Sequence, residues 1–298
     1  MAIPLTLVVW ASAFVGIRMA VQEYSPGDLA LVRFLVASIT LAAFSPFAPG
    51  GAIRLPRRRD LPGFLLMGLI GISCYHVALN AGERTVSAGS ASLIACLNPI
   101  FTSLIASMWL SERLQPRAWA GVLIGFAGAA LVAVGESPVL RFEPDAGLVL
   151  ASALFQAIYF VMQKPYFQRY RPLEVTAYVV WSGTLWLGVF APSAWEAVQT
   201  TPVNASLAAV YLGIVPGALG YVTWSYVLSR MPAGRATSFL YLIPPLALVI
   251  AWVVLEERPA GLSLLGGAVA LGGVWLVNAG RTQPRLEACS TAPVVRPS

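Results

Sequence analysis

Ten long runs of apolar residues follow one another along the chain, and short polar connections separate them. Each run is close to the roughly 20 residues that an α-helix needs to cross the hydrocarbon core of a bilayer. The runs lie at residues 3–22, 28–46, 61–82, 86–110, 116–135, 145–163, 173–191, 206–228, 234–255 and 261–279. The pattern therefore predicts an all-α membrane protein with ten transmembrane helices.

Composition agrees with this prediction and excludes a soluble enzyme. Of the 298 residues, 58% are hydrophobic and 11% are charged, and the mean hydropathy is +0.75. A soluble domain carries about 25% charged residues, so this chain lacks the polar atoms to cover a surface that faces water. The N-terminus has no positively charged region, so we expect no cleaved signal peptide. The Arg- and Pro-rich segment 281–298 is predicted to be a disordered cytoplasmic tail.

The basic residues divide unequally between alternate connections. One side collects fourteen Lys and Arg residues, including the run Arg57-Arg58-Arg59, and the other side has three. Connections on the cytoplasmic side carry the excess of positive charge. We therefore expect a bacterial-type inner membrane protein with both termini in the cytoplasm.

The chain also repeats itself. At an offset of 145 residues, the segment 88–93 aligns with 233–238, Pro99 aligns with Pro244, and Glu112-Arg113 aligns with Glu257-Arg258. Each half, 1–135 and 136–280, contains five spans, and an odd number inserts the second half in the opposite sense. Two inverted five-helix repeats around a central cavity are typical of transporters.

These residues resemble a known family. The segment Trp10-Ala11-Ser12-Ala13-Phe14, the stretch 31–35 and the duplicated Glu-Arg motifs are similar to the ten-helix, EamA-type branch of the drug/metabolite transporter superfamily. The resemblance covers residues 3–280, and exporters of the YddG type are the nearest subgroup. It implies export of amino acids, aromatic or broadly neutral, and of related metabolites by alternating access.

Polar and aromatic side chains within the spans are the candidates for substrate binding, because such groups are costly in a bilayer unless they face a cavity or a partner. His76 is the only histidine, and Asn80 follows it on the same helix face. Structural hydrogen bonding and core packing are the alternative roles for this set. The candidates are Trp10, Arg33, Tyr75, His76, Asn80, Asn98, Tyr159, Trp181, Tyr221, Trp224 and Tyr241.

Arg33 lies inside the second span without a charged counterpart in the other half. Its guanidinium either braces the carbonyl ends of neighbouring helices or meets a substrate carboxylate. Pro99 in the fourth span and Pro244-Pro245 in the ninth occupy matched positions. Because proline removes a backbone donor, we expect both helices to bend there, and paired breaks indicate a hinge.

The spans contain no second histidine or nearby carboxylate to complete a metal site with His76, and the three cysteines form no CxxC pair. The sequence contains no GxxxxGK[ST] loop, so ATP is not the direct energy source. We therefore expect no cofactor, no metal, no nucleic acid partner and a monomer. The alternatives are a carrier of sugar phosphates or nucleotide sugars, which would need several basic residues in the cavity, and, more remotely, an intramembrane enzyme.

Overall fold

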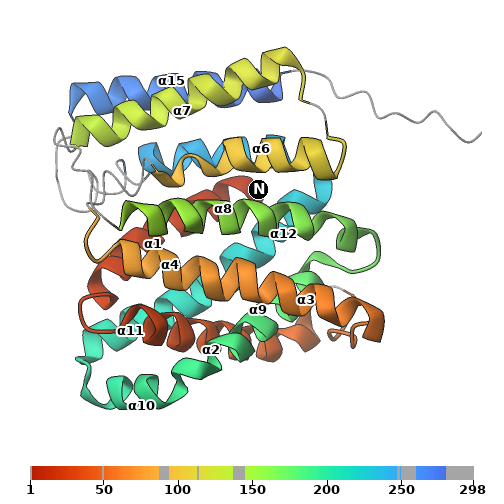
Figure 1. Cartoon of the computed structure of the whole chain (residues 1–298), viewed down its shortest axis with the longest axis vertical. Helices are drawn as coiled ribbons and strands as arrows, with labels where there is room; N and C mark the ends of the chain where they lie inside the picture. Colours follow the sequence, from red (N-terminus) through yellow and green to blue (C-terminus); the bar gives the residue numbers. More distant parts are fainter. Residues whose placement is uncertain are drawn as a thin grey trace, which may run out of the picture.

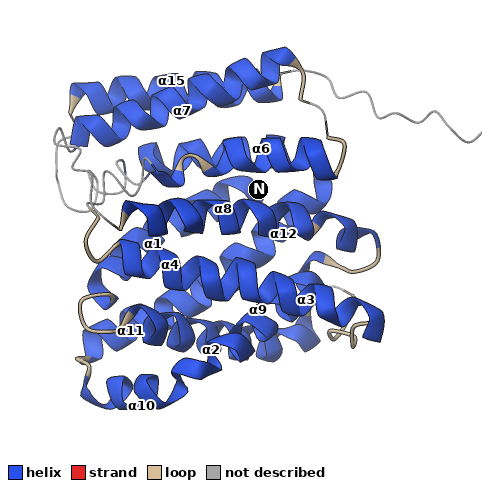
Figure 2. Cartoon of the chain, in the orientation of Figure 1, coloured by secondary structure: helices blue, strands red, loops and turns tan. Residues whose placement is uncertain are grey.

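The protein is a bundle of roughly parallel and antiparallel helices (Figure 1). The structure is a computed structural model, and it describes residues 2–48, 50–86, 94–112, 114–136, 145–246, 249 and 260–279. These residues form helices and connections and no β-strand (Figure 2). The predicted tail 281–298 and the repeated segments 88–93 and 257–258 lie outside the described residues.

Four of the five predicted spans of the first half match helices within a few residues, and the fourth, predicted at 86–110, contains α6, which begins only at Asn98. They are α1 (Ala2–Ala20), α2 (Pro26–Phe44), η1 (Ser45–Phe47), η2 (Arg58–Asp60), α3 (Leu61–Gly68), η3 (Leu69–Cys74), α4 (Tyr75–Gly82), α6 (Asn98–Trp109) and α7 (Pro116–Glu136). Of these, α3, η3 and α4 are continuous and together form the third predicted span.

The second half contains more and shorter elements. Its elements are α8 (Ala146–Met162), η4 (Lys164–Gln168), α9 (Pro172–Leu187), η5 (Gly188–Phe190), α10 (Ala191–Thr200), α11 (Val203–Leu212), η6 (Gly213–Gly220), α12 (Tyr221–Arg230), α13 (Ala233–Ser238), η7 (Phe239–Leu242) and α15 (Gly261–Asn278). The segments α11, η6 and α12 are continuous and form the eighth predicted span.

Six helical stretches of the described residues are long and apolar enough to cross a membrane. They are Pro26–Phe47, Arg58–Gly82, Ala146–Gln168, Pro172–Thr200, Val203–Arg230 and Gly261–Asn278. Shorter apolar stretches, Ala2–Ala13 and Pro116–Val132, begin α1 and α7. Large apolar side chains such as Ile39, Leu123 and Trp275 are exposed on the outside of the bundle, where a lipid environment accommodates them.

The two predicted proline bends are breaks between helical segments. Cys96 and Leu97 form a turn before α6 begins at Asn98, with Pro99 in its first turn. In the second half the 3₁₀ segment η7 precedes a new helical stretch that starts at Ile243, with Pro244 and Pro245 in its first turn. Proline is favourable there because its missing N–H has no intrahelical acceptor at a helix start. The chain therefore restarts a helix at both positions instead of bending one.

Two π-helical segments interrupt the third and eighth spans at equivalent places. The segments are η3 and η6, and each ends one residue before an α-helix that carries polar side chains into the bundle. The pattern of apolar residues predicts neither segment. In η6, Pro216 lies inside the helix, and proline widens or breaks the normal hydrogen-bond ladder.

Helices α7 and α15 lie side by side at one edge of the bundle (Figure 1). Their contact is built on glycine, which lets two helix backbones approach closely. A Cβ atom on Gly128 would lie 2.3 Å from the backbone nitrogen of Ala270, and one on Gly273 would lie 2.3 Å from that of Gly125. The two backbones approach so closely that no larger side chain fits between them.

Candidate functional site

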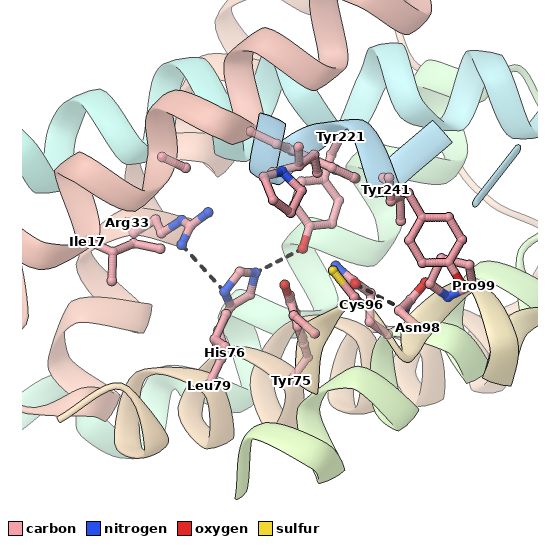
Figure 3. Close-up of a pocket in the computed structure, with 17 residues that line it drawn as sticks. Ile17, Arg33, Tyr75, His76, Leu79, Cys96, Asn98, Pro99, Tyr221 and Tyr241 are labelled. Carbon is pink, nitrogen blue, oxygen red and sulfur yellow. Dashed lines mark hydrogen bonds between the residues drawn. The ribbon is translucent and has the colours of Figure 1, made fainter. Parts of the chain in front are cut away.

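A cavity of about 110 Å³ lies in the centre of the bundle, and we refer to it as the central cavity. Both halves of the chain line it. Side chains reach it from α1, α2, α4, α6 and α8, from the start of α12, and from η7 and the stretch that follows it. Figure 3 shows polar and aromatic side chains from these elements pointing toward one shared space.

A chain of three hydrogen-bonded side chains forms one end of this cavity (Figure 3). Nη1 of Arg33 lies 3.4 Å from Nδ1 of His76, and Nε2 of His76 lies 2.9 Å from the Tyr221 hydroxyl oxygen. A guanidinium has donors and no acceptor, so Nδ1 must accept and the proton of a neutral imidazole must be on Nε2. His76 then donates to Tyr221, and the hydroxyl hydrogen of Tyr221 remains available to another acceptor.

Aromatic rings form the walls around this chain. Trp10 lies against Tyr221 with ring centroids 5.9 Å apart, and Tyr75 lies against His76 with centroids 4.4 Å apart. Such rings contact apolar side chains and also attract ammonium groups through their π faces. The cavity therefore offers apolar and weakly electronegative surfaces beside the polar end.

The other end of the central cavity carries amide and phenol groups. Asn98 donates from Nδ2 to Oε1 of Gln156 at 3.0 Å and to the carbonyl of Ala153 at 3.2 Å. Tyr241 is buried, and its hydroxyl has no hydrogen-bond partner among the described residues. Figure 3 shows Asn98 and Tyr241 apart from the Arg33 and His76 pair, with Tyr75 between them.

Most of the candidates from the sequence meet in this cavity. Its lining includes Trp10, Arg33, Tyr75, His76, Asn98, Tyr221 and Tyr241, together with the two predicted hinge residues Pro99 and Pro244. These residues are far apart in the sequence and belong to both halves, as expected for a site between two repeats.

Four candidates do not line the cavity. Asn80 points away and donates to the carbonyl of Pro26, while Trp181 donates from Nε1 to the carbonyl of Ser38. Tyr159 and Trp224 are fully buried and pack behind the lining residues, Tyr159 against Gly71 and Trp224 against Trp10. Their positions on buried helix faces are those of core residues, and none of the four is part of the cavity lining. The third hinge candidate, Pro245, also lies outside the lining.

Sequence reasoning missed Gln156 and Cys96. Both line the central cavity, and Gln156 is the acceptor for Asn98. The available signal was the position of Gln156, an uncharged amide in the middle of an apolar span, which aligns with Trp10 in the other half. Among the described residues, no group of three His, Cys, Asp or Glu side chains is placed to hold a metal ion.

Comparisons with known proteins agree with this architecture. The model of the EamA-like transporter family matches residues 1–134 and again residues 146–279. A protein of Streptantibioticus cattleyicolor described as "Probable terminal-alkyne amino-acid exporter" is 42% identical, covering 97% of this chain and 96% of its own. A Salmonella typhimurium protein described as "Probable amino-acid metabolite efflux pump" is 28% identical, covering 91% and 92%.

A solved crystal structure shares the fold. It superimposes with a TM-score of 0.75 at 21% identity, and the match covers 93% of this chain and 95% of that one. The sequence analysis expected an EamA-type protein of the drug/metabolite transporter superfamily, and the family match over both halves confirms it. The chain belongs to the EamA-like transporter family.

Proposed function

We propose that the protein exports amino acids and related small amphipathic metabolites across the inner membrane by alternating access. The observation that carries the proposal is the central cavity, where a cationic and hydrogen-bonding end adjoins aromatic walls. An amino acid presents the complementary set, which is a carboxylate, an ammonium group and a side chain. The names of the two relatives point to the same substrate class.

We further propose that ten spans form two inverted five-helix repeats, residues 1–135 and 136–280. The packing supports this assignment, because helix contacts occur in matched pairs: α1 contacts α12 as α8 contacts α4, and α2 contacts η6 as α9 contacts η3. His76 and Tyr221, 145 residues apart, bond to each other between the halves. One chain supplies both repeats, so the active unit is a monomer, and Pro99, Pro244 and Pro245 mark the hinges.

Polar contacts at one end of the bundle support a closed cytoplasmic side. Nζ of Lys164 donates to the carbonyls of Leu228 (2.9 Å) and Met231 (2.7 Å) and lies 3.7 Å from Oε1 of Glu112. Oε2 of Glu112 accepts the backbone N–H of Ala233 at 2.7 Å. The ends of α6, α8 and α12 are joined there. The central cavity lies beside the start of α6, and twelve helical residues, or about 18 Å, separate the two ends of that helix.

The test of function is counterflow in proteoliposomes. Purified protein is reconstituted, the vesicles are loaded with one unlabelled amino acid at a time, and uptake of the labelled form is followed. We expect counterflow for amino acids and none for sugar phosphates. We also expect downhill movement, so an imposed pH gradient alone should drive no accumulation. Accumulation that depends on the gradient and disappears in His76→Ala would identify proton coupling instead.

Topology is tested by cysteine labelling in intact cells. In a background without Cys74, Cys96 and Cys289, single cysteines are placed at Arg57 and within residues 196–204. An impermeant maleimide should reach residues 196–204 and should miss position 57. Labelling of position 57 from outside would contradict cytoplasmic termini.

A further inference from the structure

Arg33 is a buried cation that contacts no carboxylate of the described residues. The residue is 3% exposed, and α2 places it about 10 Å from the start of that helix. Three ion pairs occur among the described residues, Lys164–Glu112, Arg169–Asp60 and Arg171–Glu174, and Arg33 is in none of them. A charge in this position is costly unless a partner of opposite charge reaches it.

The hydrogen bonds of the guanidinium are also incomplete. The bond that the structure gives it runs to the neutral His76, and its Nε atom is buried without a partner among the described residues. The sequence left open whether Arg33 braces the carbonyl ends of neighbouring helices. That role needs a hydrogen bond from the guanidinium to a helix-end carbonyl, and none occurs among the described residues. The guanidinium instead borders the central cavity.

Glu83 is a carboxyl group that interacts electrostatically with Arg33 without contacting the guanidinium. It follows the last residue of α4 and forms no ion pair with Arg33. Burial raises the pKa of Glu83 to about 7, and the positive charge of Arg33 opposes that rise. Near neutral pH this carboxyl is therefore partly protonated and balances only part of the charge on Arg33.

We propose that Arg33 is the carboxylate anchor of the central cavity, with the free hydroxyl hydrogen of Tyr221 as the second donor. The substrate class is therefore molecules that carry a carboxylate, and the proposal rests on the exporter function proposed above. A guanidinium binds a carboxylate through two parallel charge-assisted hydrogen bonds, which a carboxamide cannot match. His76 holds both donors in place, since it accepts from one and donates to the other.

The test compares acids with their amides in the same reconstituted protein. Counterflow is measured for phenylalanine and leucine and for phenylalaninamide and leucinamide, in wild type, Arg33→Gln, Arg33→Lys and Arg117→Gln. Arg117 lies against the ring of Trp275 and outside the cavity, so its variant is the matched control for loss of an arginine. The acid-to-amide ratio within one preparation is independent of how much folded protein it contains.

We expect wild type and Arg117→Gln to prefer the acids by at least about tenfold. Arg33→Gln should bring the ratio to near one, and Arg33→Lys, which keeps the charge but not the planar pair of donors, should fall between them. If Arg33→Gln cannot be reconstituted, the comparison of the acid-to-amide counterflow ratios of wild type and Arg33→Lys tests the proposal.

Equal rates for acid and amide in wild type would overturn the anchor and leave the exporter function standing. An unchanged ratio in Arg33→Gln would also overturn it. Absence of counterflow for every amino acid tested would overturn the exporter function and the anchor with it.

Discussion

The third span (α3, η3 and α4) and the eighth span (α11, η6 and α12) both contain a π-helical segment, but only one of the two segments contains a proline. In η6 the distortion contains Pro216, whose ring removes a backbone donor. In η3 there is no proline, and the distortion is accompanied by contacts with other helices. Ser73 donates to the carbonyl of Gly183 at 2.9 Å, and Gly71 lies against the ring of Tyr159. A proline is therefore not required for a π-helical segment at this place in a span.

The side chains that follow the two segments also differ. At equivalent positions the third span carries His76, Leu79 and Glu83, and the eighth carries Tyr221, Trp224 and Leu228. His76 and Tyr221 meet in the central cavity, but Leu79 borders that cavity while Trp224 is packed behind it. The two spans thus contribute different side chains beside the shared His76–Tyr221 bond: Leu79 and Glu83 in the third, and the buried Trp224 and Leu228 in the eighth.

The largest expected effect on stability comes from removing the buried side chain of Trp224. Trp224→Ala should lower the free energy of unfolding by about 3–5 kcal/mol, because a fully buried indole packs against Trp10 and Phe160. The equivalent change Leu79→Ala should cost less, since Leu79 already borders open space. Thermal unfolding in detergent measures both, and equal losses would contradict the distinction between the two spans.

Adding one methyl group to η3 should have the next largest effect. Gly71→Ala places a Cβ 2.3 Å from Cγ of Tyr159, and overpacking of this kind costs about 1–3 kcal/mol. Gly147→Ala is the control, because no atom lies within 4 Å of the added Cβ. We expect a lower melting temperature for the first variant and an unchanged or higher one for the second. A higher melting temperature for Gly71→Ala would contradict the tight packing of η3 against Tyr159.

Removing one hydroxyl from the cavity should reduce transport without unfolding the protein. Tyr221→Phe removes the acceptor for Nε2 of His76 and a donor that faces the cavity. One such bond contributes about 0.5–1.5 kcal/mol, so counterflow should fall about twofold to tenfold at equal expression. Tyr75→Ala, which removes a whole ring from the lining, should reduce counterflow further. Normal transport in both variants would place the substrate site elsewhere.

The smallest expected effect concerns Glu83, which has the apolar Leu228 as its counterpart. Since the pKa of Glu83 is raised to about 7 by burial, its carboxylate is ionised above that pH and then competes with a substrate carboxylate for the charge of Arg33. Counterflow of an amino acid should therefore rise about twofold between about pH 8 and about pH 6. Glu83→Gln should abolish this rise, and a rise that persists in the variant would assign it to another group.

The sequence predicted the parts of this molecule that follow from composition and spacing. Most apolar runs match helices within a few residues of their bounds, but α6 begins at Asn98, twelve residues after the predicted start of the fourth run, and the ninth run begins with the short segments α13 and η7. The sequence also predicted seven of the cavity residues, because polar and aromatic groups within a span need either a cavity or a partner.

The features that the sequence did not predict depend on how the helices pack against one another. Periodicity places Tyr75 and Trp224 within equivalent spans, but the packing of neighbouring helices determines which ring reaches the cavity. The segment η3 has no clear local signal in the sequence. Ser73 and Gly71 do not indicate it by themselves, because the residues they contact, Gly183 and Tyr159, belong to other helices. Gln156 was overlooked because its importance lies in accepting from Asn98, a residue of another helix.

The contact between α7 and α15 has a consequence for biosynthesis. During translation α7 leaves the ribosome well before α15, so the glycine face of α7 first meets lipid, and the helix that fits it is the last one described in the chain. Because a Cβ on Gly128 would already collide with the backbone of Ala270, a helix with larger side chains at this contact would not fit. A polypeptide that ends before Gly261 would therefore leave the glycine face of α7 without its partner helix.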